Sequence, residues 1–127
     1  MFDSENNKAT ILVVDDEPVI RELIKAQLAV LGYNPLTACS GHDAILKSKN
    51  FNQLDVLLTD ILMPCMNGIE LVDKFKKLFP ETKIILMSGY MTPPPGISDY
   101  PTGKYPFLKK PFNLEQLNSE IQKVLTH

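Results

Sequence analysis

Short apolar runs alternate along the chain with segments in which apolar residues recur every three or four positions. Most runs are rich in branched side chains and free of polar interruptions, which is typical of strands covered on both faces of a sheet. One weaker run contains a proline and is typical of an edge strand. We therefore predict five strands, at Ile11–Val14, Pro35–Ala38, Val56–Thr59, Ile84–Met87 and Phe107–Leu108.

Four amphipathic helices are predicted around these strands. The first begins near Pro18, whose fixed φ suits a first helical turn, and ends at Gly32. The other three begin at residues that can cap a helix with a side-chain oxygen, namely Ser40, Asn67 and Asn113. After both asparagines, a glutamate or glutamine follows at the spacing of a capping box. Each helix carries an apolar stripe that can pack against a sheet.

This alternation indicates an α/β domain in which right-handed helical crossovers join parallel strands into a doubly wound sheet. The chain has 127 residues, which is close to the commonest size of a single domain. We expect a flexible arm over residues 1–8 and one folded domain over residues 9–127. Half of the 10 prolines lie between residues 93 and 106, so we expect a proline-rich loop there in place of a helix.

Charge and composition narrow the class of partner. The chain has 13 basic and 15 acidic residues, and it lacks a basic cluster that could grip nucleic acid. It also lacks the run of about 20 apolar residues that a membrane span needs, and its polar start is unlike a signal peptide. The two cysteines, Cys39 and Cys65, form no disulfide framework. We expect a cytoplasmic protein that binds neither nucleic acid nor membrane.

Chemically reactive side chains follow the predicted strands at their carboxyl ends. Asp15 and Asp16 follow the first strand, Asp60 the third, Ser88 the fourth and Lys110 the fifth. The carboxyl ends of parallel strands share one edge of a sheet, where open α/β folds bind their ligands. Crowded carboxylates repel one another unless they share a proton or a cation, and hard oxygen ligands suit Mg²⁺. Such a site could bind a phosphoryl group, which one carboxylate attacks.

In their order and spacing, these segments resemble the receiver domain of response regulators in two-component signalling (CheY-like). The resemblance extends from Thr10 to Leu125, and it is strongest to receivers attached to hybrid sensor histidine kinases. It implies a flavodoxin-like fold with the strand order 2-1-3-4-5. The motifs that carry it are Val13–Glu17, Thr59–Pro64 with Asn67-Gly68, Met87–Gly89 and Phe107–Phe112.

The resemblance assigns an acceptor and a metal site. Asp60 would accept a phosphoryl group from a histidine kinase or a histidine phosphotransfer protein, in a Mg²⁺-dependent reaction that the chain catalyses on itself. Asp15 and Asp16 would hold the metal ion together with Asp60 and the backbone carbonyl of Leu62. The chain would thus be a signalling module and not an enzyme that turns over a substrate.

The resemblance also assigns a switch. Ser88 and Lys110 would bind the phosphoryl group once it is attached, and Phe107 would turn inward as Ser88 moves. The result would be a changed affinity for a downstream protein. In many receivers the face used for dimerisation includes the helix that the proline-rich loop replaces here, so we expect a monomer or a weak dimer.

Other functions fit the same residues less well. A small phosphohydrolase with an aspartyl nucleophile usually has a second aspartate two residues later, where this chain has Leu62. A pseudo-receiver would act by docking alone. The altered loop after Ser88 keeps this alternative open. A nucleotide-binding domain is excluded, because its first loop should offer glycines and N–H groups to phosphate, whereas Asp15–Pro18 is acidic.

Overall fold

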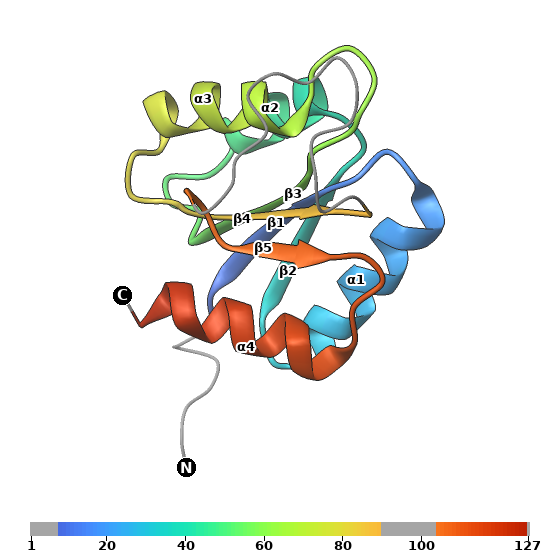
Figure 1. Ribbon diagram of the computed structural model, residues 1–127. Helices are drawn as coiled ribbons and strands as arrows, with labels where there is room; N and C mark the ends of the chain where they lie inside the picture. Colours follow the sequence, from blue (N-terminus) through green and yellow to red (C-terminus); the bar gives the residue numbers. More distant parts are fainter. Residues whose placement is uncertain (1–7, 90–103, 127) are drawn as a thin grey trace.

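The computed structural model describes residues 8–89 and 104–126, which form a parallel sheet with helices on both faces (Figure 1). The strands are β1 (Thr10–Val14), β2 (Asn34–Ala38), β3 (Val56–Asp60), β4 (Lys83–Ser88) and β5 (Phe107–Lys109). The helices are α1 (Pro18–Val30), α2 (Gly41–Ser48), α3 (Gly68–Leu78) and α4 (Leu114–Leu125). The 5-stranded sheet has the order β2-β1-β3-β4-β5, and every pairing is parallel. The predicted doubly wound fold and its strand order are confirmed.

The sheet divides the core into two layers. Helices α2 and α3 cover one face, and α1 and α4 cover the other (Figure 1). Successive side chains of a strand point to opposite faces, so Leu12 and Val14 of β1 pack toward α2 and α3. Ile11 and Val13 pack in the other layer, and all four side chains are at most 1% exposed. Burial on both faces explains why the strand is a continuous apolar run.

Three helices begin at the caps that the sequence predicts. The Ser40 hydroxyl accepts a hydrogen bond from a backbone N–H three residues on, at 3.0 Å. Asn67 and Glu70 form a reciprocal capping box, with both hydrogen bonds 2.9 Å long, and Asn113 opens α4 in the same way. The box at Asn67 fixes the point at which the chain turns into α3 after leaving β3.

The first helix buries less than its apolar stripe predicts. Its N-cap residue, Glu17, makes no side-chain cap. Ile24 and Leu28 are buried, but Val19 and Leu23 are 79% and 53% exposed. A helix that lies on one face of an open sheet buries only the residues that face the strands, and the stripe of α1 is wider than that. Part of the apolar stripe of α1 is therefore exposed on the surface of the domain.

Two predictions concern residues outside the described part of the chain. The flexible arm over 1–8 lies there except for Lys8, which is exposed. The loop predicted in place of a helix falls mostly on residues 90–103, which are also outside the described ranges. Among the helices of the described part, none is long and apolar enough to cross a membrane.

Candidate functional site

The topology brings four of the predicted site residues to one edge of the sheet. Strands β1 and β3 are neighbours, with Val14 opposite Thr59, so the next residues, Asp15 and Asp60, lie side by side. Lys110 follows β5, and its backbone N–H donates to the carbonyl of Ser88 at the end of β4, at 2.8 Å. Residues that are up to 95 positions apart in the chain thus meet at the carboxyl ends of the strands.

Three carboxylates form a cluster at this edge. One oxygen from each of Asp15, Asp16 and Asp60 can be chosen so that all three lie within 4.8 Å of one another. Asp15 is fully buried and Asp60 is 7% exposed, whereas Asp16 is open to solvent. A hard divalent cation that keeps part of its water shell, such as Mg²⁺, suits three carboxylate oxygens with one side open. The donor set therefore fits the metal that the sequence predicts.

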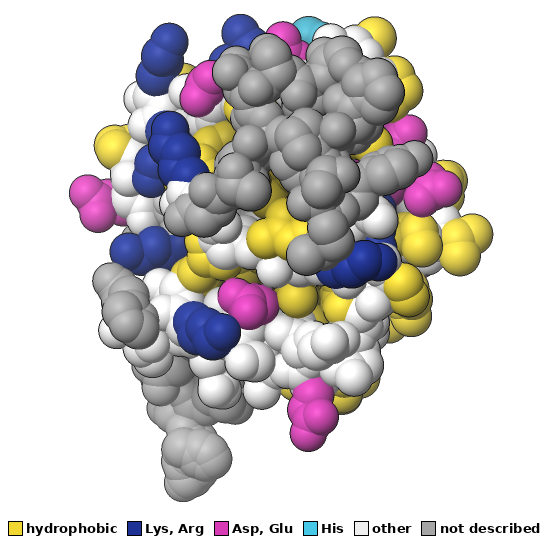
Figure 2. All heavy atoms as spheres, in the orientation of Figure 1, with side chains coloured by type: hydrophobic (Ala, Val, Ile, Leu, Met, Phe, Trp, Pro, Cys, Tyr) yellow, Lys and Arg dark blue, Asp and Glu magenta, His cyan; other side chains and the backbone are white. Residues whose placement is uncertain are grey.

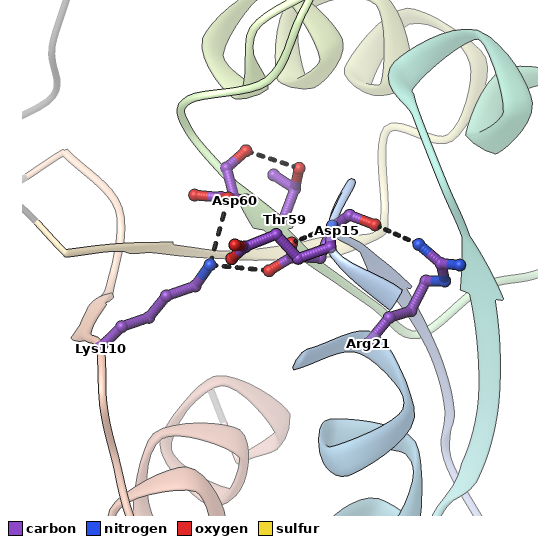
Figure 3. A network of polar contacts seen from close by, with 6 residues as sticks. Asp15, Arg21, Thr59, Asp60 and Lys110 are labelled. Carbon is purple, nitrogen blue, oxygen red and sulfur yellow. Dashed lines mark hydrogen bonds and ion pairs between the residues drawn. The ribbon is translucent and has the colours of Figure 1, made fainter. Parts of the chain in front are cut away.

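A single ammonium group balances part of this negative charge. The Nζ of Lys110 lies 2.7 Å from Oδ2 of Asp15 and 3.1 Å from Oδ2 of Asp60 (Figure 3). The lysine side chain is 17% exposed, so its charge is little screened by water. The Lys110–Pro111 peptide bond is cis. Lys110 therefore links the two buried carboxylates directly.

Burial and charge together raise two pKa values at the site. Burial raises the pKa of Asp60 to about 6, against the lowering effect of the Lys110 charge and with a further rise from Asp15. Burial alone would lower the pKa of Lys110, but its hydrogen bond to Asp15 and the charges of both aspartates outweigh burial and raise it. Near neutral pH, Asp60 is mostly ionised and Lys110 is charged.

The backbone around Asp60 is held tightly. The N–H of Leu62 donates to the Asp60 carboxylate, and the Thr59 hydroxyl donates to the Asp60 carbonyl at 3.0 Å. Gly68 begins α3 directly behind this point, and a side chain there would overlap the Asp60 carbonyl and lie 2.9 Å from Cα of Ile61. Only glycine permits so close an approach. The role of the Leu62 carbonyl as a metal ligand stays a prediction.

Ser88 and Phe107, which the resemblance assigns to the switch, lie on the neighbouring strands β4 and β5. Ser88 ends β4, is 1% exposed, and sits one residue beyond Met87, which pairs with Asp60. Phe107 begins the outer strand β5 opposite Leu86, and it is half-buried against the layer of α2 and α3. Phe107 therefore lies on the edge strand of the sheet and is not part of the acidic cluster. The switching roles of Ser88 and Phe107 stay predictions.

Arg21 belongs to the polar network although the sequence pattern does not single it out. Its Nη1 donates to the carbonyl of Asp15 at 2.7 Å, on the side of Asp15 away from Lys110 (Figure 3). One signal could have found it. The first turn of α1 has no acidic residue, and a positive charge near a helix N-terminus is unfavourable. An arginine in that place indicates an acceptor nearby.

Residues 11–122 match the family model of the response regulator receiver domain. The chain is 34% identical over 117 residues to the DNA-binding transcriptional regulator NtrC of Azospirillum brasilense. This match covers 92% of the chain and 24% of NtrC. It is 40% identical over 84 residues to the autoinducer 1 sensor kinase/phosphatase LuxN of Vibrio campbellii, covering 66% of the chain and 10% of LuxN. The chain thus spans only a small part of these relatives.

Solved structures show the same architecture over nearly the whole chain. The chemotaxis protein CheY4 of Vibrio cholerae has a TM-score of 0.80 and 29% identity, covering 92% of this chain and 98% of CheY4. The receiver domain of the hybrid histidine kinase CckA has a TM-score of 0.76 and 28% identity, covering 92% and 99%. The response regulator TrrA of Thermotoga maritima, solved with Mg²⁺ and BeF, has a TM-score of 0.77 and 35% identity, covering 91% and 98%.

The fold, the acidic cluster at the sheet edge and these similarities all indicate a receiver domain. TrrA has also been solved in complex with the histidine kinase ThkA, so a relative of this chain pairs with such a kinase. A receiver domain is a signalling module and not a metabolic enzyme. The chain belongs to the family of response regulator receiver domains of two-component systems.

Proposed function

We propose that the chain is a phosphoacceptor in a two-component phosphorelay and that Asp60 takes the phosphoryl group from a phosphohistidine donor. One observation carries the proposal. The Asp60 carboxylate lies 3.1 Å from the Lys110 ammonium and within 4.8 Å of oxygens of Asp15 and Asp16. Three carboxylates crowded at a strand edge repel one another, so the arrangement is explained by a cation that they share. The complex of TrrA with a histidine kinase supports the class of donor.

The proposed reaction is a displacement at phosphorus. A carboxylate oxygen of Asp60 attacks, the bond from phosphorus to the imidazole nitrogen breaks, and the imidazole keeps the electron pair and takes up a proton. Lys110 would balance the charge of the phosphoryl oxygens at a half-buried position, where water weakens the interaction little. Asp15, Asp16, Asp60 and the Leu62 carbonyl would hold Mg²⁺, which neutralises charge on the transferred group.

The proposed output is a shift between two states of the domain. A bound group moves such an equilibrium only through contacts that differ between the states. Ser88, which ends β4, and Lys110, which follows the neighbouring strand β5, are proposed to make these contacts with the attached phosphoryl group. Phe107, at the half-buried start of β5, is proposed to change its burial and so alter the surface that a downstream protein meets.

Intact-protein mass after incubation with acetyl phosphate tests the proposal, with and without Mg²⁺. We expect a single phosphoryl adduct that forms only when Mg²⁺ is present. If the protein is folded and binds Mg²⁺ but takes up no phosphoryl group from any tested donor, it is a pseudo-receiver that acts by docking. Such a result would sink the proposal.

The exposed part of α1 carries large hydrophobic side chains. Figure 2 shows hydrophobic side chains gathered over α1, and Val19 and Leu23 are 79% and 53% exposed. Leu23 also lines a groove of about 250 Å³ that runs to Lys110 and Phe112. Within the same groove, Oε1 of Gln27 is buried and accepts no hydrogen bond from the described residues. We propose that an apolar helix face of the donor packs here, beside Asp60.

Leu23→Glu is expected to slow phosphotransfer from a protein donor by at least about tenfold, because a charge in the groove opposes an apolar partner. Phosphorylation by acetyl phosphate should be unchanged, since the small donor needs no docking surface. Leu46→Glu is the matched control, because Leu46 is 65% exposed on the opposite layer. The measurement is transfer of ³²P from a histidine kinase that phosphorylates the unmodified chain. Equal rates for both variants would place the docking surface elsewhere.

The raised pKa of Asp60 predicts a pH dependence of folding stability without Mg²⁺. The pKa rises from 3.8 to about 6 on folding, so the folded state holds this proton more tightly than the unfolded chain. Between these two pH values the contribution of Asp60 to the unfolding free energy falls as pH rises, by about 3 kcal/mol in total. Urea unfolding at pH 4 to 7 should therefore show Asp60→Asn gaining stability over the unmodified chain as pH rises. A constant difference between the two proteins would contradict the shift.

A further inference from the structure

Every polar atom of Asp15 is engaged, and each by a different part of the fold. The backbone N–H donates to the carbonyl of Ala38 at 3.3 Å. One carboxylate oxygen accepts from the N–H of Glu17 at 2.9 Å, and the other accepts from Lys110 at 2.7 Å. The backbone carbonyl accepts from Arg21 at 2.7 Å (Figure 3). The proposed chemistry uses the carboxylate of Asp15, but it gives no role to the bond at the carbonyl.

The bond from Arg21 controls the orientation of one peptide plane. The carbonyl of Asp15 and the N–H of Asp16 belong to the same planar unit, so a donor that fixes the carbonyl also fixes the direction in which Asp16 leaves the strand. The Asp16 side chain is exposed and makes no hydrogen bond or ion pair within the described residues. Its place in the acidic cluster therefore depends on the backbone that carries it.

The position of Arg21 has a cost that a surface arginine would avoid. It is the fourth residue of α1, where a positive charge faces the positive end of the helix. Arg21 is half-buried, and its hydrogen bond to the Asp15 carbonyl is short and charge-assisted. We propose that Arg21 is a positioning residue of the metal site, which holds the Asp15–Asp16 peptide so that the Asp16 carboxylate stays in reach of Mg²⁺. The inference rests on the proposed function for the role of that metal.

The charge and the hydrogen bond of Arg21 act on metal affinity with opposite signs. A positive charge close to a cation site lowers its affinity, so loss of the charge alone would make Mg²⁺ bind more tightly. Loss of an outer partner that orients a ligand weakens metal binding, typically by 10-fold or more. The direction of the change therefore separates a positioning residue from a merely charged neighbour.

Calorimetric titration of the protein with Mg²⁺ alone, without a phosphodonor, tests the inference. We expect Arg21→Met to raise the Mg²⁺ dissociation constant about tenfold. Arg21→Lys keeps a charged donor and should recover part of the loss. Lys25→Met is the matched control, because it removes the same charge from an exposed position one turn further along α1. Its affinity should be equal to or slightly tighter than that of the unmodified chain.

A second readout separates positioning from damage to the fold. At saturating Mg²⁺, the rate at which Arg21→Met takes up phosphoryl from acetyl phosphate should approach that of the unmodified chain, while the Mg²⁺ needed for half the rate increases. An unchanged or tighter Mg²⁺ affinity in Arg21→Met would overturn the inference. The inference would also be overturned if the loss of Mg²⁺ affinity in Arg21→Met disappears when the affinity is corrected for the folded fraction of the protein, as measured by circular dichroism. If the unmodified chain itself binds no Mg²⁺, the proposed function fails first and independently of Arg21.

Discussion

The Asp60→Asn variant is expected to take up no phosphoryl group from acetyl phosphate in the presence of Mg²⁺. Asparagine keeps the size of the side chain, but its amide oxygen is a far weaker nucleophile than a carboxylate. The buried pair with Lys110 is lost as a charge interaction, yet the hydrogen bond from the lysine to the amide oxygen can remain. Intact-protein mass should show a complete loss of the adduct, which is the largest effect that a single substitution can have here.

Asp73→Asn is the matched control for this result. Asp73 lies on the exposed side of α3, so its substitution removes the same charge without touching the acidic edge. The control should form the adduct at the rate of the unmodified chain. An adduct of equal yield on Asp60→Asn would show that another carboxylate is the acceptor, and Asp16, the exposed member of the cluster, would be the first to test.

The sequence predicts most of this fold because the signals that define its elements are local. The run Ile11–Val14 and the caps at Asn67 and Asn113 depend only on neighbours within a few positions, and each predicted strand extends by at most one or two residues in the structure. The site was predictable for a different reason. Parallel strands place their carboxyl ends together, so residues such as Asp15 and Asp60 needed only the topology to be brought into contact.

What the sequence does not predict depends on the direction of side chains and on contacts across the fold. Val19 and Ile24 are both apolar members of the stripe on α1, but only the docking of the helix on the sheet decides that one is exposed and the other buried. The bond from Arg21 to the Asp15 carbonyl is set by the loop between them. The raised pKa of Asp60 comes from burial, which no local pattern specifies.

Lys110→Met is expected to lower the stability of the Mg²⁺-free protein by about 3 kcal/mol. The ammonium is the only positive group that the described residues place in direct contact with the Asp15 and Asp60 carboxylates. Removing one partner of a buried ion pair typically costs about 3–5 kcal/mol, because the charge left behind is desolvated and unpaired. The lower end applies here, since Asp60 can take up a proton once the lysine no longer holds its pKa down.

Lys109→Met is the control for Lys110→Met. Lys109 precedes Lys110 but is exposed, and among the described residues its ammonium contacts only the Lys110 carbonyl, at 3.4 Å. Because a surface lysine contributes little to stability, this variant should unfold within about 0.5 kcal/mol of the unmodified chain. Urea unfolding without metal compares all three proteins under the same conditions.

Added Mg²⁺ should reverse much of the loss in Lys110→Met. A cation held by the acidic cluster supplies the positive charge that the lysine no longer provides, and a ligand that binds only the folded state stabilises it in proportion to its affinity. The variant should bind Mg²⁺ more tightly than the unmodified chain, because the competing ammonium 2.7 Å from Asp15 is gone. An equal stability loss with and without saturating Mg²⁺ would contradict a shared site for the lysine and the metal.

The same variant should nevertheless take up phosphoryl groups more slowly, even at saturating Mg²⁺. The metal can replace the lysine as a balance for the ground-state charge of Asp15 and Asp60, but it cannot occupy the position from which Nζ reaches the oxygens of an incoming phosphoryl group. Tighter Mg²⁺ binding combined with slower phosphotransfer would separate two roles of the Lys110 ammonium. The first is to balance the charge of Asp15 and Asp60, which the metal ion can also do. The second is to contact the incoming phosphoryl group, which requires a positive charge at the position of Nζ beside Asp60.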